Sequence, residues 1–112
     1  MNYCQDGIKI SFGTETQEYT YNLIYGHYEI QPSDINDRPY FKMGTSNLAN
    51  GIWWSDGMWY IGPDWIKGTA AGFAYVATDK FCPNQLPMEE YWYLYTSAGW
   101  KRAKKNLLIS CK

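Results

Sequence analysis

Residues 52–61 read Ile52-Trp53-Trp54-Ser55-Asp56-Gly57-Met58-Trp59-Tyr60-Ile61. An Asp-Gly pair between two apolar runs is a strong signal for a β-hairpin, because a type I′ turn needs a positive φ angle at both central residues. A two-residue turn at Asp56-Gly57 pairs Trp53 with Tyr60, whereas a three-residue turn would pair Trp53 with Trp59. In either register this stretch forms the hairpin around which we expect the rest of the chain to be arranged.

The two-residue turn divides the rings of the hairpin between two faces, because side chains alternate from one face of a strand to the other. Trp54 and Trp59 share one face, where we expect them to fill the core. Trp53 and Tyr60 share the opposite face, which meets water when an antiparallel sheet covers a core on one side only. If this face meets water, Trp53 and Tyr60 are exposed and can bind a ligand, whereas a second layer of the fold would cover them and leave no binding site there.

Short alternating or aromatic runs recur on both sides of the hairpin, separated by Gly, Pro and other turn residues. Besides the hairpin, these runs predict strands at residues 8–12, 24–30, 40–43, 73–77, 91–95, 100–103 and 107–111. About eight short strands at such spacing favour an all-β fold, either an antiparallel β-sandwich or a small barrel. The length and the absence of a linker-like stretch predict a single β domain over residues 1–112.

The sharpest alternation in the chain lies within residues 91–95. Trp92 falls on one face, where we expect it in the core, as we also expect for Trp100 in the next run. Tyr91, Tyr93 and Tyr95 fall on the other face. This alternation predicts a row of three tyrosines pointing away from the core.

The composition is unusually aromatic, with six Trp, eleven Tyr and four Phe in 112 residues. Such a composition excludes disorder, which requires few aromatic residues, and a Leu-rich helical bundle. No apolar run approaches the roughly 18 residues of a membrane span, so we expect no membrane insertion. Met1 to Cys4 lack the basic start and apolar stretch of a signal peptide, so a secreted protein would carry that signal outside this sequence.

The net charge of −1 is unevenly distributed along the chain. All eleven acidic residues lie within the first 100 positions, whereas residues 101–112 carry five Lys or Arg and no acid. A basic cluster beside aromatic residues can bind nucleic acid, but such binding normally uses a basic face supported by the whole domain. We expect no nucleic-acid partner and interpret these cations as solvated charges on a turn and an edge strand, where they discourage edge-to-edge pairing.

Three cysteines are present, Cys4 and Cys111 almost at the two ends and Cys82 between them. Because the termini of compact domains often lie close together, a Cys4–Cys111 bridge is geometrically natural, and it would contribute about 4.7 kcal/mol in the chain-entropy model. Such a bridge favours a secreted protein or an extracellular domain. The alternative is three buried thiols in a reducing compartment. Cys82 precedes a proline in a loop, and burial, pairing outside the domain and a free thiol are all open to it.

Residues that carry catalysis are scarce. The single histidine, His27, lies on the polar face of a predicted strand, which is typical of a surface residue. Cys82 matches no local nucleophile motif, and the adjacent Glu89 and Glu90 would point to opposite faces of an extended chain. A cysteine-dependent enzyme is therefore only a third hypothesis, and we expect no enzyme activity and no cofactor.

A loop supplies oxygen atoms that a cation could bind, from Asp34, Asn36 and Asp37. This loop lacks the spacing and the terminal glutamate of an EF-hand. With one histidine and no Cys-x-x-Cys, the chain also lacks the usual zinc spacings. We therefore expect no metal site.

The remaining candidate site consists of the rings that alternation directs away from the core, with one carboxylate beside them: Trp53, Tyr60, Tyr91, Tyr93, Tyr95 and Asp56. Flat rings flanked by Asp56, Asn47 and Asn50 suit a sugar, whose C–H face stacks on a ring while its hydroxyls bond to amides and carboxylates. The first hypothesis is therefore a non-catalytic, lectin-like module that binds a glycan. The alternative is a protein-interaction or self-assembly module of a secreted or matrix protein, because Tyr and Trp also suit protein interfaces. In a homo-oligomer of that kind, Cys82 could link the chains.

A series of turn and aromatic positions spans about residues 4 to 111: Gly26-x-Tyr28, Arg38-Pro39-Tyr40, Ile52-x-Trp54, Gly57-x-Trp59-x-Ile61-Gly62, Cys82-Pro83, Trp92, Gly99-Trp100 and Ile109-x-Cys111. This order resembles small, aromatic-rich, all-β extracellular modules of multidomain and secreted proteins, mostly of invertebrates. The resemblance implies a folded extracellular unit with its terminal cysteines paired. It carries over no catalytic or binding residue.

Overall fold

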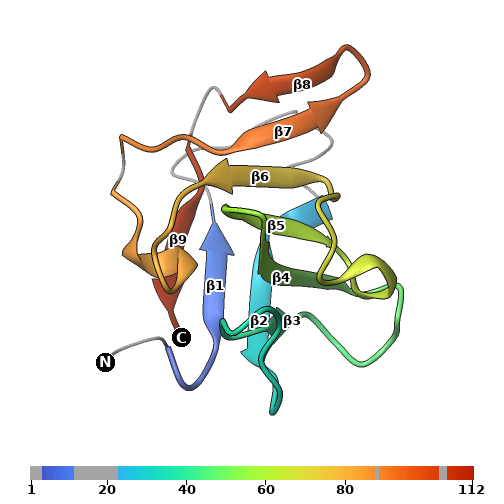
Figure 1. Cartoon of the computed structure of the whole chain (residues 1–112), viewed down its shortest axis with the longest axis vertical. Helices are drawn as coiled ribbons and strands as arrows, with labels where there is room; N and C mark the ends of the chain where they lie inside the picture. The colour runs from blue at the N-terminus through green and yellow to red at the C-terminus, as the bar shows by residue number, and fades with distance from the viewer. Residues whose placement is uncertain (1–3, 12–22, 88, 104–105) are drawn as a thin grey trace.

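The computed structural model describes residues 4–11, 23–87, 89–103 and 106–112, and nine strands within these ranges form one antiparallel sheet (Figure 1). The strands are β1 (Ile8–Ser11), β2 (Gly26–Ile30), β3 (Phe41–Lys42), β4 (Asn50–Ser55), β5 (Met58–Pro63), β6 (Ala74–Ala77), β7 (Tyr93–Thr96), β8 (Gly99–Arg102) and β9 (Leu108–Cys111). Two 3-10 helices, η1 (Asp64–Ile66) and η2 (Pro83–Gln85), lie in the connections. The prediction of an all-β antiparallel fold is confirmed, and Phe12, the last residue of the first predicted strand, lies outside the described ranges.

The sheet has the strand order β8-β7-β6-β5-β4-β3-β2-β1-β9. Each strand from β1 to β7 therefore pairs with the next one along the chain, and β9 returns to pair with β1. Figure 1 shows how the sheet curls, with β7 and β8 at the top of the view and β1, β2 and β9 below. The result is a curled half-barrel whose two edges are β8 and β9.

One face of the curled sheet holds the main hydrophobic core. Trp59 and Trp92 are buried there, as their strand parity predicts. Trp54 also packs against this core but is only half-buried, and the Arg38 guanidinium lies 4.0 Å from its ring centroid. The largest fully buried side chains of this core are the following: Ile8, Ile10, Ile24, Tyr28, Phe41, Ile52, Trp59, Ile61 and Trp92.

The hairpin of β4 and β5 has the two-residue turn. Ser55 pairs with Met58, and the register then pairs Trp53 with Tyr60. Asp56 and Gly57 have φ angles of 51° and 82°, so both central residues occupy the left-handed region that a type I′ turn requires. The register predicted for Asp56-Gly57 is confirmed, and it places Trp53 and Tyr60 on the face opposite the main core.

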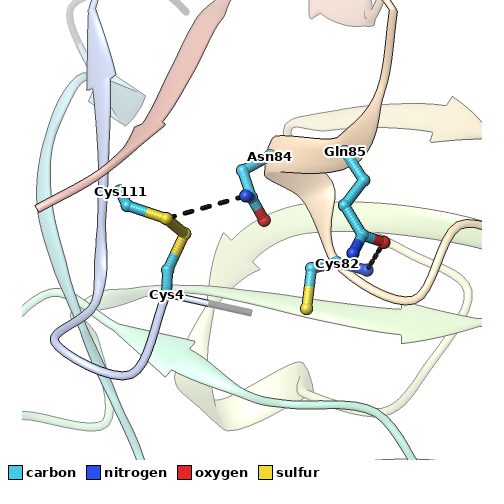
Figure 2. Close-up of a disulfide and its surroundings, with 5 residues drawn as sticks. All are labelled: Cys4, Cys82, Asn84, Gln85 and Cys111. Atoms are coloured by element: carbon cyan, nitrogen blue, oxygen red, sulfur yellow. Dashed lines mark hydrogen bonds between the residues drawn. A yellow bond between two sulfur atoms is a disulfide. The ribbon is translucent and has the colours of Figure 1, made fainter. Parts of the chain in front are cut away.

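A disulfide joins Cys4 to Cys111, with their Cα atoms 4.9 Å apart (Figure 2). The pairing of β1 with β9 places Cys111 opposite Ile8, a few residues after Cys4 in the chain. The predicted bridge between the terminal cysteines is therefore present. Cys82 is a free thiol and is fully buried. The hypothesis that Cys82 links chains is wrong for this fold, because a buried thiol cannot reach a second molecule.

Candidate functional site

A row of aromatic rings crosses four neighbouring strands on the face opposite the main core. Trp53 on β4 pairs with Tyr60 on β5, Tyr60 pairs with Tyr75 on β6, and Tyr75 pairs with Tyr93 on β7. The ring centroids of successive residues are 6.4, 6.1 and 5.3 Å apart. We call these four residues the aromatic row. It forms because residues directly opposite each other on paired strands project from the same face.

The first half of the aromatic row is buried. Trp53 is 0% exposed and Tyr60 is 6% exposed, and both pack in a second small cluster with Tyr40. Two loops contribute to the covering layer, since Ile35 and Ile66 both pack against this cluster. In residues 63–72, which include η1, the Thr69 carbonyl also accepts a hydrogen bond from the Trp53 indole at 2.8 Å. Of the two alternatives for Trp53 and Tyr60, exposure and a covering layer, the structure shows the covering layer, so the hypothesis of a ligand bound on these two exposed rings is wrong.

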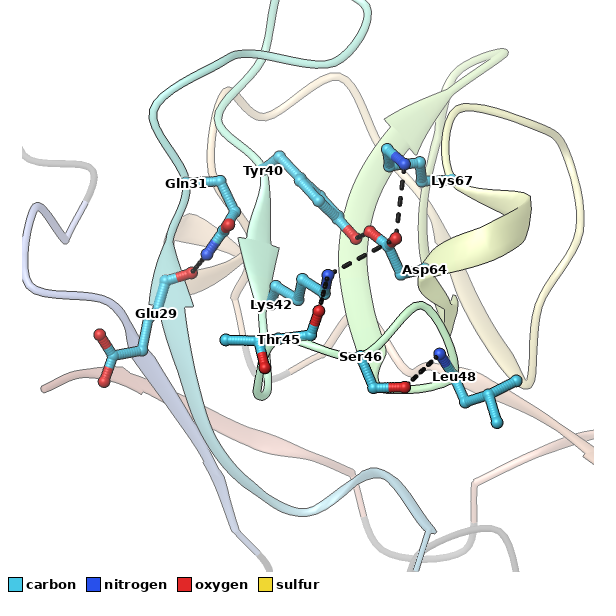
Figure 3. Close-up of polar contacts among 9 residues, drawn as sticks. All are labelled: Glu29, Gln31, Tyr40, Lys42, Thr45, Ser46, Leu48, Asp64 and Lys67. Atoms are coloured by element: carbon cyan, nitrogen blue, oxygen red, sulfur yellow. Dashed lines mark hydrogen bonds and ion pairs between the residues drawn. The ribbon is translucent and has the colours of Figure 1, made fainter.

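A charged group holds this covering segment in place (Figure 3). Asp64, the first residue of η1, is buried, and its carboxylate accepts a 2.5 Å hydrogen bond from the Tyr40 hydroxyl. The ammonium groups of Lys42 and Lys67 lie 3.5 and 3.4 Å from the same carboxylate. Burial acts to raise the pKa of Asp64, but the Tyr40 hydrogen bond and the two lysines outweigh burial, so the pKa is lowered. The contacts tie η1 to β3 and so keep Trp53 covered.

The second half of the aromatic row is open to solvent. Tyr93 is 38% exposed, and it is joined by Tyr95 at 54% and Trp100 at 41%. The Trp100 ring centroid lies 4.8 Å from that of Tyr75 and 5.3 Å from that of Tyr95, with its plane at 73° to both. We call Tyr75, Tyr93, Tyr95 and Trp100 the aromatic patch. It covers neighbouring strands β6, β7 and β8 at one edge of the sheet.

The expectation that Trp100 lies in the core is wrong. The register of β7 and β8 pairs Tyr95 with Trp100 and Leu94 with Lys101. Trp100 therefore shares the face of Tyr95, whereas Leu94 faces the main core. Tyr75 and Trp100 were both missed as site residues, although alternation within residues 73–77 separates Tyr75 from Ala74 and would have indicated its face.

One cation, Arg102, borders the aromatic patch on its own face of the sheet, and a second, Lys101, lies on the other face. Arg102 pairs with Tyr93, and its guanidinium lies 4.7 Å from the Tyr91 ring centroid. Tyr91 is consequently half-buried, so of the three predicted tyrosines, Tyr93 and Tyr95 are the exposed ones. Lys101 is exposed on the other face of β8, opposite Leu94. The aromatic patch thus consists of tyrosine and tryptophan side chains with one arginine beside it.

Asp56 lies near the buried half of the aromatic row rather than within the patch. It is exposed in the β4–β5 turn. Burial raises the pKa of Tyr60, and the charge of Asp56 raises it further, which places that carboxylate near the Tyr60 side chain. The Asn50 amide, expected beside a sugar, instead donates a 2.6 Å hydrogen bond to the Leu23 carbonyl. Asn47 lies in the loop whose backbone bonds to Trp65 of η1.

Cys82, one of the residues considered for catalysis, is buried. Burial raises the pKa of the Cys82 thiol to about 12, although the nearby Arg38 charge acts in the opposite direction. Such a thiol stays protonated near neutral pH and is a poor nucleophile. His27 is exposed on β2 and pairs with Lys9. The Asn36 amide, considered for a cation, donates to the carbonyls of Trp54 and Gly68.

Within the part of the chain that the structure describes, no group of three His, Cys, Asp or Glu side chains is placed to hold a metal ion. In that same part, no helix has the length and apolar character to cross a membrane. Comparison of the chain with models of protein families, with curated proteins and with solved structures found no match. The function is therefore inferred from the geometry of the aromatic patch.

Proposed function

We propose that this protein is a non-catalytic, extracellular binding module that recognises a protein partner through the aromatic patch. The observation that carries the proposal is the exposed cluster of Tyr93, Tyr95 and Trp100 beside Arg102 at one edge of the sheet. Tyrosine, tryptophan and arginine are the residue types that contribute most binding energy at protein interfaces. Their rings offer a large contact area with few rotatable bonds to order on binding.

The orientation of the rings favours a protein over a sugar. Tyr75 and Tyr93 are nearly parallel, at 8°, with centroids 5.3 Å apart. That separation is close to the spacing of neighbouring strands, so the two rings face one another across β6 and β7. One face of each ring is therefore turned toward the other ring, which leaves fewer ring faces on which a ligand could stack. A sugar would need an open ring face, whereas a protein surface can use edges and hydroxyls.

A carbohydrate is the second candidate ligand, and Trp100 is the residue that favours it. Its ring lies at 73° to Tyr75 and Tyr95 and therefore stands outside the parallel pair. A partly exposed indole in this orientation can offer one face to a pyranose. The patch would then hold a single sugar unit on Trp100, with neighbouring tyrosine hydroxyls as hydrogen-bond partners.

The disulfide supports the extracellular part of the proposal. A bridge between Cys4 and Cys111 forms and persists in oxidising surroundings, and small secreted domains commonly depend on such bridges. The buried Cys82 thiol supports the non-catalytic part, because its raised pKa keeps it unreactive.

Selection from defined libraries tests the proposal. The immobilised wild-type protein is panned against a random peptide library displayed on phage and is separately applied to a glycan array. Trp100→Ala is expected to weaken binding of the selected peptides by about 30-fold, the loss typical of an interface hot spot. Trp65→Ala is the matched control, because Trp65 is a tryptophan on η1, outside the patch, and 63% exposed. It should leave binding unchanged.

The outcomes separate the two ligands. Peptides that lose binding with Trp100→Ala but not with Trp65→Ala support a protein partner. Glycan binding with the same dependence, without any selected peptide, would replace the first candidate with the second. Binding that is indifferent to Trp100→Ala, or no binding to either library, would overturn the patch as the recognition surface. Near-ultraviolet circular dichroism of each variant checks that the fold is kept.

A further inference from the structure

Strand β8 is an edge of the sheet. It stands at one end of the strand order and pairs with β7 on one side only, among the residues that the structure describes (Figure 1). An edge strand presents N–H and C=O groups that can pair with a further strand. The aromatic patch therefore lies beside a backbone that can itself take part in recognition.

The hydrogen bonds of the β7–β8 pair identify which backbone groups point outward. Ala103 donates from its backbone N–H to the Trp92 carbonyl at 2.9 Å, so this pair is a hydrogen-bonded one. In an antiparallel ladder, hydrogen-bonded and non-hydrogen-bonded pairs alternate. Lys101 therefore directs its backbone groups toward β7, whereas Trp100 and Arg102 direct theirs toward the open edge.

The same two residues also carry the patch side chains. Trp100 contributes its indole to the aromatic patch, and Arg102 contributes its guanidinium at the border of the patch. An added strand paired to their backbone would place alternate side chains directly against Trp100 and Arg102. Its intervening side chains would face the exposed ammonium of Lys101 on the other side of the sheet. One short segment could thus use the backbone edge, the patch and both cations together.

The positive charges of Lys101 and Arg102 indicate which kind of strand can pair with β8. A second copy of the chain that paired its own β8 here would bring Lys101 and Arg102 of both molecules into one short ladder, where like charges oppose pairing. This is the usual protection of an edge strand against self-association. An acidic segment instead meets opposite charges on both faces. Charge complementarity therefore favours a different protein with acidic side chains over a second copy.

We propose that β8 receives an extended, acidic segment of the partner protein as an added strand, paired to the outward backbone groups of Trp100 and Arg102. This inference rests on the proposed function, since it requires a protein partner. It adds the mode of binding, β-strand addition, and the chemistry of the partner.

A pair of variants at one position tests the backbone contact. Arg102→Ala removes the guanidinium and keeps the backbone N–H, whereas Arg102→Pro removes both. Proline is tolerated on an edge strand where the lost N–H faces solvent, so the β7–β8 ladder should survive. If a peptide strand pairs here, Arg102→Pro should bind about 3- to 10-fold more weakly than Arg102→Ala, the worth of one hydrogen bond.

The probe is a short, end-capped peptide of alternating valine and glutamate, labelled with fluorescein and followed by fluorescence anisotropy. The control peptides replace every glutamate with lysine, or carry N-methyl groups along the backbone and so lack hydrogen-bond donors. Hydrogen exchange of the protein amides provides an independent measurement. The Trp100 and Arg102 amides should exchange rapidly in the free protein and become protected when the acidic peptide is added.

The proposal is supported if the acidic peptide binds and the lysine and N-methylated peptides bind at least about tenfold more weakly. The Trp100 and Arg102 amides should also become protected from hydrogen exchange. Equal binding by Arg102→Pro and Arg102→Ala, together with unchanged exchange at both amides, would overturn strand addition. So would preference for the lysine peptide, or no binding of any of these peptides. If phage-selected peptides still depend on Trp100 in that case, the patch remains a protein-binding surface and only the mode of binding is rejected. Light scattering that shows a dimer dissociated by Arg102→Pro would assign the edge to a second copy instead, which also overturns the proposal.

Discussion

At the scale of single residues, Asp64 shows how one buried charge positions a functional surface. Its carboxylate is satisfied by the Tyr40 hydroxyl and by two lysine ammonium groups, at 2.5 to 3.5 Å. Burying a charge is costly unless it is paired and hydrogen-bonded, so these contacts are what allow η1 to lie against the sheet. By anchoring η1, Asp64 helps to keep Trp53 covered. The exposed part of the aromatic row therefore lies farther from η1, at Tyr93 on β7.

The lowered pKa of Asp64 predicts a pH dependence of stability. The unfolded Asp64 carboxyl has a pKa of about 3.9, and the folded one has a lower pKa. At pH values between these two, the folded chain binds fewer protons at this site than the unfolded chain does. Asp64 therefore stabilises the fold above about pH 3.9, and its contribution is lost as the pH falls through the folded pKa.

Asp64→Asn should lower the free energy of unfolding at pH 7 by about 1.5 to 3 kcal/mol, because hydrogen bonds to a charged group are lost. It should also flatten the fall in stability below about pH 4. Urea unfolding of both proteins across this pH range measures the two effects. Asp79→Asn, at an exposed carboxylate, is the control. If the free energy of unfolding falls below about pH 4 in the same way in Asp64→Asn as in the wild type, Asp64 is not the cause of that fall.

At the scale of elements, the β4–β5 hairpin is determined by its turn. Gly57 has a φ angle of 82°, and a Cβ atom built on it would meet nothing within 4 Å. Its requirement for glycine is therefore a matter of backbone conformation alone. Gly51, near the start of β4, needs glycine for a different reason, because a Cβ atom there would collide with the Tyr40 ring and hydroxyl.

Gly57→Ala should destabilise the protein by about 1 to 2 kcal/mol, the cost of a left-handed conformation for a residue with a Cβ atom. Gly51→Ala should be more damaging, because Tyr40 must move and lose its contact with Asp64. Gly57→Asn is the control, since asparagine tolerates the left-handed region better than alanine. Urea denaturation ranks the three variants, and a Gly51→Ala protein as stable as Gly57→Ala would contradict this explanation.

At the scale of the whole molecule, the disulfide and the pairing of β1 with β9 join the two ends of the chain. Cys4 and Cys111 are 107 residues apart in sequence, and their bridge lies beside η2, where the Asn84 amide contacts the Cys111 sulfur at 3.6 Å (Figure 2). A link between such distant residues restricts the unfolded chain strongly. The bridge is thus expected to carry a large share of the stability of so small a domain.

Replacing both cysteines, as Cys4→Ala with Cys111→Ala, should cost up to about 4.7 kcal/mol of unfolding free energy. In the wild type, Ellman's reagent should detect almost no thiol in the native state and one thiol per chain after denaturation, because only the buried Cys82 is free. Cys82→Ala should abolish that signal and keep the bridge. Three thiols in the denatured wild type would show that the bridge does not form.

The local features of this protein follow from short-range patterns in its sequence. Alternating or aromatic runs between turn residues located each strand that the structure describes within a few residues. The Asp56-Gly57 turn set the register of the central hairpin, because only a few residue types accept two successive positive φ angles. The positions of Cys4 and Cys111 indicated the bridge that the structure contains.

Which of the aromatic rings are exposed to solvent depends on tertiary contacts. Strand parity correctly placed Trp53, Tyr60, Tyr93 and Tyr95 on one face, but parity says nothing about what covers that face. The covering of Trp53 and Tyr60 depends on contacts of Ile35 and of residues 63–72, which no local pattern specifies. The exposure of Trp100 depends on the register of β7 with β8. The covering of Trp53 and Tyr60 and the exposure of Trp100 both depend on contacts between residues far apart in the sequence. The alternation within a single strand does not specify these contacts, and they determine where the aromatic patch lies.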